Sequence, residues 1–284
     1  MSTADIYINA FADEASSEID GQICALKRNN LSGIEIRNVD GTNVSDITCA
    51  KAKEVRAKFD NAGLSVFSVG SPIGKNDIDD AFEPHAEKLR RTLETACILG
   101  AKYIRVFSFY IPSGKNADIY CGKVTDRIVA MCDIADEFKI TLCHENEKGI
   151  YGDTAERCRK IFEDIPSLGG VFDPANFVQC GENALDAWNI VKPHINYLHI
   201  KDCAADGTIV PAGEGIGNIR EIISDYTALG KKYITLEPHL MEFDGLSGLE
   251  RNGEQSAVGG HVYSSNDEAF DVACAALNKV LGEI

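Results

Sequence analysis

Short apolar segments alternate with amphipathic helical patterns from one end of the chain to the other. Eight of these segments have the length and residue types of β-strands, and they are Ile6–Ala10, Gly33–Arg37, Leu64–Val69, Tyr103–Phe107, Ile140–Glu145, Gly170–Asp173, Ile195–Lys201 and Tyr233–Pro238. Eight β–α units without a change in composition predict an α/β fold, a single (β/α)8 TIM barrel over residues 1–284. A doubly wound sheet fits less well, because it buries both strand faces under apolar helices, whereas these strands carry polar residues near one end.

Several element boundaries are predicted from local signals. Gly63 and Gly100 each end a helix directly before a strand. Ser17 and Asp20 have the spacing of a capping box ahead of the first helix, and Asp153 stands where it can cap a later one. The last helix is predicted over residues 267–281, and the irregular stretch 241–266 is expected to fold over the open end of the barrel.

Charge and cysteine usage narrow the classes of function. The formal net charge of −16 would repel a phosphate backbone, so no nucleic-acid partner is expected. No apolar run reaches the length of a membrane span, and residues 1–5 do not resemble a secretion signal. The ten cysteines stand singly, without a C-x-x-C pair, which favours free thiols over disulfides. A cytoplasmic protein without a membrane partner is therefore predicted.

Potential metal ligands stand at the C-terminal ends of the last four predicted strands. Because side chains alternate across a strand, one face of these strands is apolar and the other ends in Glu145, Asp173, His199 and Glu237. In a barrel these strand ends meet at one mouth, where working residues lie. Three carboxyls buried together would repel one another without a cation. Three carboxylates and one imidazole suit a divalent cation, so a metal-dependent enzyme is predicted.

The residues around these four positions also carry a family resemblance. The chain resembles the xylose isomerase-like TIM barrels in segments that match in order and spacing, namely His144–Asn146, Gly170–Pro174, Tyr197–Asp202, Val210–Gly215 and Ile234–Pro238. More narrowly, it resembles the sugar phosphate isomerase/epimerase group, which includes ketose 3-epimerases and inosose-processing enzymes. The resemblance implies that Glu145, Asp173, His199 and Glu237 bind one divalent metal ion. It also implies that the two glutamates exchange protons with the substrate.

The implied chemistry is proton transfer beside a carbonyl group. A metal chelated by carbonyl and hydroxyl oxygens polarises the carbonyl bond and stabilises an enediolate. Glu145 and Glu237, on opposite sides of a bound sugar, would act as the acid/base pair. The predicted function is a metal-dependent isomerase or epimerase of a sugar, a polyol ketone or a sugar phosphate. The metal is Mn²⁺, Zn²⁺, Mg²⁺ or Co²⁺, and carboxylate-rich ligation favours Mn²⁺ or Mg²⁺.

Three other functions stay open at this point. A keto-polyol dehydratase of the inosose type would use the same metal site, because the same enediolate can expel a β-hydroxyl group. An endonuclease IV-like phosphodiesterase uses the same barrel with a histidine-rich site for three metals, which six histidines and a charge of −16 disfavour. A barrel that binds a sugar or metal without turnover is the third. A homo-oligomer is also open, because no diagnostic surface patch is visible.

Further residues are predicted to contact substrate, and they are Asn176, Lys201, Glu147, Arg105 and His239. Ketose 3-epimerases carry a histidine at the position of Asn176, and an amide cannot titrate, so the substrate identity stays open. Lys201 can neutralise an enediolate or a phosphate, or can pair with Asp202 or Glu237. Glu147 is either a group close to the site or a loop charge.

Two other patterns have structural interpretations. Glu35 and Arg37 share the inward face of the second strand with the inward-facing Arg105 of the fourth, and a buried layer of ion pairs is favoured there over substrate contact. The run Gly213–Gly217 follows the seventh strand, where barrels often bind phosphate. Loop flexibility is the preferred interpretation, because Glu214 would oppose an anion.

Overall fold

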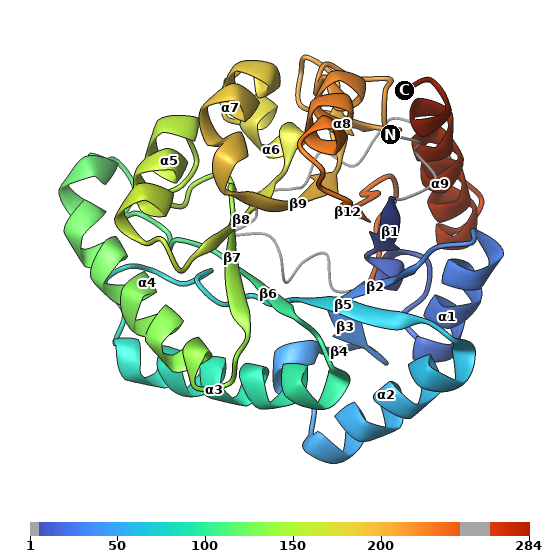
Figure 1. The fold of residues 1–284 in the computed structure, drawn as a ribbon, viewed down its shortest axis with the longest axis horizontal. Helices are drawn as coiled ribbons and strands as arrows, with labels where there is room; N and C mark the ends of the chain where they lie inside the picture. Colours follow the sequence, from blue (N-terminus) through green and yellow to red (C-terminus); the bar gives the residue numbers. More distant parts are fainter. Residues whose placement is uncertain (1–5, 245–261) are drawn as a thin grey trace.

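A closed barrel of parallel strands forms the centre of the computed structural model, which describes residues 6–244 and 262–284 (Figure 1). The barrel strands are β1 (Tyr7–Ala10), β2 (Gly33–Ile36), β5 (Ser65–Gly70), β6 (Tyr103–Val106), β7 (Thr141–Glu145), β8 (Gly169–Phe172), β9 (Ile195–Ile200) and β12 (Tyr233–Leu236). They pair in the order β1-β12-β9-β8-β7-β6-β5-β2, and β1 also pairs with β2. The predicted α/β TIM barrel is confirmed, and each predicted strand is present within two residues of its expected bounds.

Helices surround this barrel as a continuous outer layer (Figure 1). They are α1 (Ile19–Arg28), α2 (Cys49–Ala62), α3 (Phe82–Leu99), α4 (Cys121–Asp136), α5 (Ala155–Asp164), α6 (Pro174–Gln179), α7 (Ala184–Val191), α8 (Ile219–Ala228) and α9 (Asn266–Gly282). Short 3-10 helices are η2 (Ala12–Glu14), η3 (Val44–Asp46), η4 (Ala117–Tyr120) and η5 (Lys192–His194). As predicted, Gly63 and Gly100 end α2 and α3, with φ angles of 72° and 75° that glycine adopts without steric cost.

Two hairpins and one helix have no counterpart among the predicted elements. β3 (Asn38–Val39) and β4 (Thr42–Asn43) form a hairpin after β2, and β10 (Asp202–Cys203) and β11 (Ile209–Val210) form one after β9. The helix is α6, directly after β8. Strands of two residues are too short to show an alternating pattern in sequence. All three elements follow the C-terminal ends of barrel strands, so they build the walls of the mouth.

Side-chain alternation divides the buried apolar residues into two sets. The outward face packs under the helices in one large cluster that includes Leu142, Phe172, Leu198, Ile200, Ile234 and Leu236. The inward face forms a separate cluster of Phe67, Cys143, Val171 and Tyr197. Three of these inward residues lie two positions before a predicted metal ligand, and alternation therefore points those ligands inward as well.

Two predicted helix caps are wrong. α1 begins after Glu18, whose side chain makes no capping hydrogen bond, so Ser17 and Asp20 do not form a capping box. α5 is capped by Thr154, whose hydroxyl accepts a backbone hydrogen bond from the first turn. Asp153, one residue earlier, forms an ion pair with an arginine of that helix instead. Capping residues were thus shifted by one position, because several polar residues adjoin each helix start.

Other sequence expectations can be compared directly with the structure. All ten cysteines are free thiols, as predicted. Within residues 6–244 and 262–284, no helix combines the length and apolar character that a membrane crossing requires. Most of the stretch 241–266, which was expected to cover the mouth, lies outside the described residues, because these omit 245–261.

His85 on α3 should make folding stability depend on pH. Its Nε2 accepts a hydrogen bond from the backbone N–H of Gly74 at 3.1 Å, and burial lowers its pKa from 6.5 to about 4. The unfolded chain therefore binds a proton near pH 6.5 that the folded protein rejects until about pH 4. This histidine contributes stability above pH 6.5 that is lost toward pH 4, with an upper limit of about 3 kcal/mol.

Denaturant unfolding across that range would check this expectation. Wild-type protein should lose more stability than His85→Gln, whose amide oxygen can still accept the Gly74 hydrogen bond but does not titrate. An equal loss in both proteins would contradict the assignment.

Candidate metal centre

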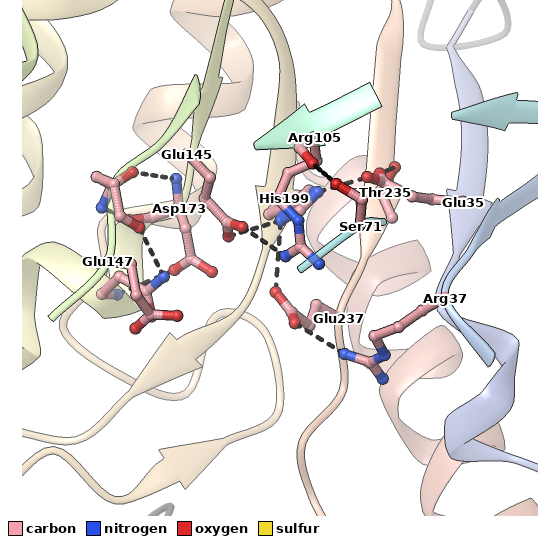
Figure 2. A network of polar contacts seen from close by, with 12 residues as sticks. Glu35, Arg37, Ser71, Arg105, Glu145, Glu147, Asp173, His199, Thr235 and Glu237 are labelled. Atoms are coloured by element: carbon pink, nitrogen blue, oxygen red, sulfur yellow. Dashed lines mark hydrogen bonds and ion pairs between the residues drawn. The ribbon is translucent and has the colours of Figure 1, made fainter. Parts of the chain in front are cut away.

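The four predicted ligands converge at the C-terminal mouth of the barrel (Figure 2). Glu145 is the last residue of β7, and His199 lies near the end of β9. Asp173 and Glu237 directly follow β8 and β12. One potential ligand atom from each residue lies within 4.8 Å of the others, and all four residues are buried. Four neighbouring strands thus deliver one side chain each to a single point.

His199 is held by carboxylates at both ring nitrogens. Its Nδ1 lies 2.8 Å from Glu145 Oε1 and 3.4 Å from Glu237 Oε2. Its Nε2 lies 3.1 Å from Glu35 Oε2 on β2. Burial would lower the pKa of His199, but Glu145 and Glu35 raise it well above its usual value. With the ring proton on Nε2 and donated to Glu35, Nδ1 can offer its lone pair to a cation in the cluster.

Asp173 is oriented by the helix that follows it. It is the N-cap of α6, and its Oδ1 accepts a hydrogen bond from the backbone N–H of Asn176 at 3.0 Å, with Pro174 in the first turn. Its Oδ2 is buried and forms an ion pair with Lys201 Nζ at 2.8 Å. Burial raises the pKa of Asp173 to about 7, although Lys201 opposes this rise. A metal cation at the cluster would share this oxygen with Lys201.

The two glutamates each place one oxygen near His199 and the other on an arginine. Glu145 Oε2 accepts a hydrogen bond from Arg105 at 2.7 Å, and Glu237 Oε1 accepts one from Arg37 at 3.3 Å. Burial raises the pKa of Glu145, but His199 and Arg105 together lower it to about 2. Cationic neighbours also outweigh burial at Glu237 and hold its pKa well below the usual range. Both carboxyls are therefore ionised at neutral pH.

Lys201 lies between two of the predicted ligands. Its Nζ is 2.8 Å from Asp173 Oδ2 and 3.4 Å from Glu237 Oε2. The expected pairing with Glu237 is present, whereas the alternative pairing with Asp202 is not, because that carboxylate accepts four backbone hydrogen bonds elsewhere. Lys201 therefore adds a fixed positive charge to the carboxylate-rich mouth.

A second group of candidate ligands consists of Glu14, Glu237 and His239. His239 Nε2 is buried and without a hydrogen-bond partner among the described residues, and it lies 3.6 Å from Glu14 Oε1 and from Glu237 Oε1. Arg37 lies 3.0 Å from the same oxygen of Glu14. Its charge opposes a cation at this second group. His239 thus lines the mouth beside the main cluster.

The other predicted substrate contacts lie around this centre. The side-chain amide of Asn176 donates a hydrogen bond to the Asn146 carbonyl at 2.9 Å, which ties the loop after β7 to α6. Glu147 forms a 2.8 Å ion pair with Lys75. Arg105 faces inward, as expected, and contacts a predicted ligand. Whether these residues contact substrate stays a prediction, because their protein contacts do not test it.

Glu35 has a role that sequence reasoning missed. Besides its contact with His199, the Glu35 carboxylate accepts a hydrogen bond from Thr235 Oγ1 at 2.9 Å (Figure 2). It accepts another from Tyr197 Oη at 3.0 Å. The expected buried ion-pair layer is present, but it bears directly on the ligands. The alternating pattern showed that Glu35 points inward. It could not show that β2 and β9, which are not neighbours in the barrel, place their side chains in contact.

The donor set fits a divalent cation. Three carboxylates and one imidazole are buried together, and the orientation of each is fixed by protein contacts outside the cluster. Asp173 Oδ2, which lies 2.8 Å from Lys201 Nζ, and the inward Nδ1 of His199 are both directed to this cluster. A divalent charge would offset the repulsion among Glu145, Asp173 and Glu237. The Glu35–His199 contact is the carboxylate–imidazole pair that commonly orients a metal-bound histidine.

Glu35→Gln is expected to weaken metal binding about tenfold, because the neutral amide stabilises the Nε2–H tautomer of His199 less well. Titration calorimetry of the metal-free protein with Mn²⁺ would measure this change. Tyr197→Phe is the matched control, because it removes another hydrogen bond to Glu35 and keeps the carboxylate. Equal affinities for Glu35→Gln and wild type would contradict the orienting role.

Comparison with known proteins finds similarity in sequence and in fold. The uncharacterised protein YihM of Escherichia coli (strain K12) is 25% identical over 226 residues, and the match spans 77% of this chain but only 63% of YihM. The IOLI protein with a bound zinc atom superposes with a TM-score of 0.76 at 15% identity, over 98% of this chain and 99% of that chain. The probable 3-DHS dehydratase AsbF from Bacillus anthracis gives 0.73 at 16% identity, over 96% and 98%.

The two solved structures share the fold at low sequence identity. A family model provides the stronger evidence, because the model described as "Xylose isomerase-like TIM barrel" matches residues 24–257. The resemblance carried by the strand-end motifs is thereby confirmed. The chain belongs to the xylose isomerase-like TIM barrel family.

Proposed function

We propose that the chain is a divalent-metal-dependent isomerase or epimerase of a sugar, a polyol ketone or a sugar phosphate, with Glu145 and Glu237 as its acid/base pair. The observation that carries this proposal is the placement of the two glutamates around His199. They come from β7 and β12, which are separated by β8 and β9, and both approach the same ring nitrogen, at 2.8 Å and 3.4 Å. Two carboxylates thus face one small volume from different strands.

Each glutamate is equipped to act as a base. Arg105 and Arg37 hold Glu145 and Glu237 in place and favour their ionised forms. A fixed carboxylate can remove a proton from a carbon beside a carbonyl, and the second glutamate can return one. Return to the same carbon from the opposite side gives an epimer. Return to the neighbouring carbon moves the carbonyl group and gives an isomer.

The residues that would hold the cation are Glu145, Asp173, His199 through Nδ1, and Glu237. The donors suit Mn²⁺, Mg²⁺, Zn²⁺ or Co²⁺. Such a cation, when bound, acts as a Lewis acid that polarises the substrate carbonyl. Lys201 would support this by placing a positive charge where negative charge develops on substrate oxygen.

Solvent deuterium exchange tests the proposal. Metal-loaded protein is incubated in D₂O with a panel of ketoses and polyol ketones, and the products are followed by mass spectrometry and NMR. The expected result is deuterium at the carbon beside the carbonyl, with no loss of water. Tight sugar binding without exchange across the panel would instead support a barrel that binds without turnover.

Dehydration of a keto-polyol is the second candidate reaction. The observation in its favour is Lys201, whose ammonium group lies beside Asp173 and Glu237 and can stabilise a departing hydroxyl group by a hydrogen bond. The same exchange experiment separates the two reactions, because a dehydratase yields a product lighter by one water.

An endonuclease IV-like phosphodiesterase has less support. Its three-metal site needs several histidines, whereas the main cluster and the second group have one each, and Arg37 lies next to the second group. The net charge of −16 also repels a nucleic-acid substrate. A metal content near three per chain would revive this alternative.

A further inference from the structure

The loop between β9 and α8 forms a cradle of backbone N–H groups around a carboxylate. Asp202 Oδ2 accepts hydrogen bonds from Gly213 N at 2.9 Å and Gly215 N at 3.0 Å. Its Oδ1 accepts from Gly217 N and Cys203 N, both at 2.9 Å. Asp202 is buried, with 1% of its surface exposed. Four N–H groups thus converge on one anionic side chain.

The glycines of this cradle are required by its shape. A Cβ atom on Gly215 would lie 2.3 Å from Asp202 Oδ1, and one on Gly217 would lie 2.7 Å from the same oxygen. Gly213 has a φ of +87°, which side chains rarely adopt. The preferred interpretation of Gly213–Gly217 as a flexible loop is therefore wrong, since the glycines allow a close and specific approach to Asp202.

This loop occupies the position where other barrels bind phosphate. It follows the seventh barrel strand, and convergent backbone N–H groups are the donors that such phosphate sites use. In this chain the donors of the cradle are taken up by the carboxylate of Asp202. A phosphate group could reach them only by displacing a buried side chain that makes four hydrogen bonds.

The positively charged side chains that the structure describes at the mouth also form ion pairs with carboxylates of the chain. Arg37 lies 2.9 Å from Asp13 and 3.0 Å from Glu14, in addition to its contact with Glu237. The other pairs, each 2.7 or 2.8 Å long, are Arg105–Glu145, Lys201–Asp173 and Lys75–Glu147. A phosphate would have to compete with a carboxylate for each of these cations.

Buried carboxyl groups outnumber buried cationic side chains around the cluster. The buried carboxyl groups are Asp13, Glu14, Glu35, Glu145, Asp173 and Glu237, and the buried cations near them are Arg37, Arg105 and Lys201. A divalent cation would offset two of the three excess carboxyl groups. No positive excess is left for a phosphate ester, which carries a charge of about −2 near neutral pH.

A cavity next to the cluster is also lined mainly by acidic and polar side chains. It has a volume of about 480 Å³, adjoins Asp13, and is lined further by residues that include Ser16, Ser17, Glu242, Asp244 and Asn266. Carboxylate oxygens accept hydrogen bonds from sugar hydroxyls, but they repel a phosphate or a carboxylate. The lining therefore suits a ligand rich in hydroxyl groups and free of negative charge.

We propose that the substrate is an uncharged polyhydroxy ketone without a phosphate or carboxylate group, because the chain's own carboxylates occupy the anion-binding positions of the mouth. This inference rests on the proposed function for its catalytic meaning. The cradle itself can be tested without catalysis.

The first experiment titrates metal-free protein with inorganic phosphate, so that no bound cation attracts the anion. Wild type is expected to show no saturable binding in the millimolar range. Asp202→Ala should bind phosphate at least tenfold more tightly than wild type, because its four N–H groups are exposed to the ligand. Asp202→Asn is the control that keeps an acceptor oxygen in the cradle, and it should bind no better than wild type. Saturable binding to wild type, or no gain in a folded Asp202→Ala protein, would overturn the inference.

The second experiment compares matched pairs of a ketose and its phosphate ester in the exchange assay with metal-loaded wild type. The neutral member of a pair should exchange with a kcat/KM at least tenfold higher. Faster exchange of the phosphate esters would refute an uncharged substrate and leave the isomerase proposal intact. If no member exchanges, the proposed function fails, and phosphate binding by wild type still decides whether the mouth accepts anions. Should Asp202→Ala not fold, the wild-type titration and this comparison together decide the matter.

Discussion

Replacing either Glu145 or Glu237 with Gln is expected to reduce proton exchange about a thousandfold at saturating metal, because Gln cannot accept or return the proton. Each glutamate is one of the two carboxylates that approach the Nδ1 atom of His199, from different strands, so neither is expected to replace the other. Exchange rates are measured with the best substrate of the ketose panel, and metal content is determined for each variant. Glu163→Gln, on α5 with 51% of its side chain exposed, is the matched control and should leave the rate unchanged.

Both site variants are expected to fold. Removing one carboxylate from a cluster with more carboxyls than cations relieves repulsion, which offsets the loss of an arginine partner. Circular dichroism and thermal unfolding check this point. Near-wild-type exchange in either folded variant would refute the two-base mechanism.

Removal of the metal by a chelator is expected to abolish proton exchange. The cationic side chains described at the mouth already form ion pairs with carboxylates, so they cannot replace the metal as a Lewis acid. Addition of Mn²⁺ should restore it, with Mg²⁺, Co²⁺ and Zn²⁺ as comparisons. A second readout is stability, since a metal ion at about one hundred times its Kd should stabilise the folded state by about 2.7 kcal/mol. Thermal unfolding with and without metal measures this gain.

A substitution of Asp173 tests whether the metal that stabilises the protein binds at the predicted cluster. Asp173→Asn keeps a side-chain oxygen to cap α6 and removes the charge next to Lys201. Metal should then stabilise the protein much less than wild type. Full exchange activity in metal-depleted protein, or equal stabilisation of Asp173→Asn, would contradict a metal centre at this position.

The barrel and the four ligands could be predicted from sequence because both depend on local periodicity. Alternation within β7 fixes the face of Glu145 once Leu142 is assigned to the helix layer, and the same argument holds for His199 in β9. Neighbouring strand ends then meet at one mouth in any such barrel. Tertiary detail is not needed for this step.

Contacts across the barrel could not be predicted in the same way. Glu35 meets His199 only because the closed barrel brings β2 and β9 within side-chain reach, and no sequence spacing encodes that distance. Glu14 lies in η2, a loop segment after β1, where alternation no longer applies. Its contacts with Arg37 and His239 depend on the course of that loop.

Asp173 and Asp202 show two further limits of predicting this structure from the sequence. The order Asp173-Pro174 and the helix after it contain a cap-and-proline signal that is readable from sequence, although α6 was not predicted. The Asp202 cradle is not readable, because a glycine-rich run indicates backbone freedom without naming the partner that approaches it. The four hydrogen bonds in the structure identify the Asp202 carboxylate as the partner of this run.

The most direct test is an anomalous-scattering crystal structure of protein that has been dialysed against Mn²⁺. The expected result is one strong anomalous peak per chain at the mouth, within bonding distance of Glu145, Asp173, Glu237 and the Nδ1 atom of His199, with Nε2 still on Glu35. No peak at saturating metal, or peaks only at other residues, would contradict the metal centre on which the proposed chemistry depends.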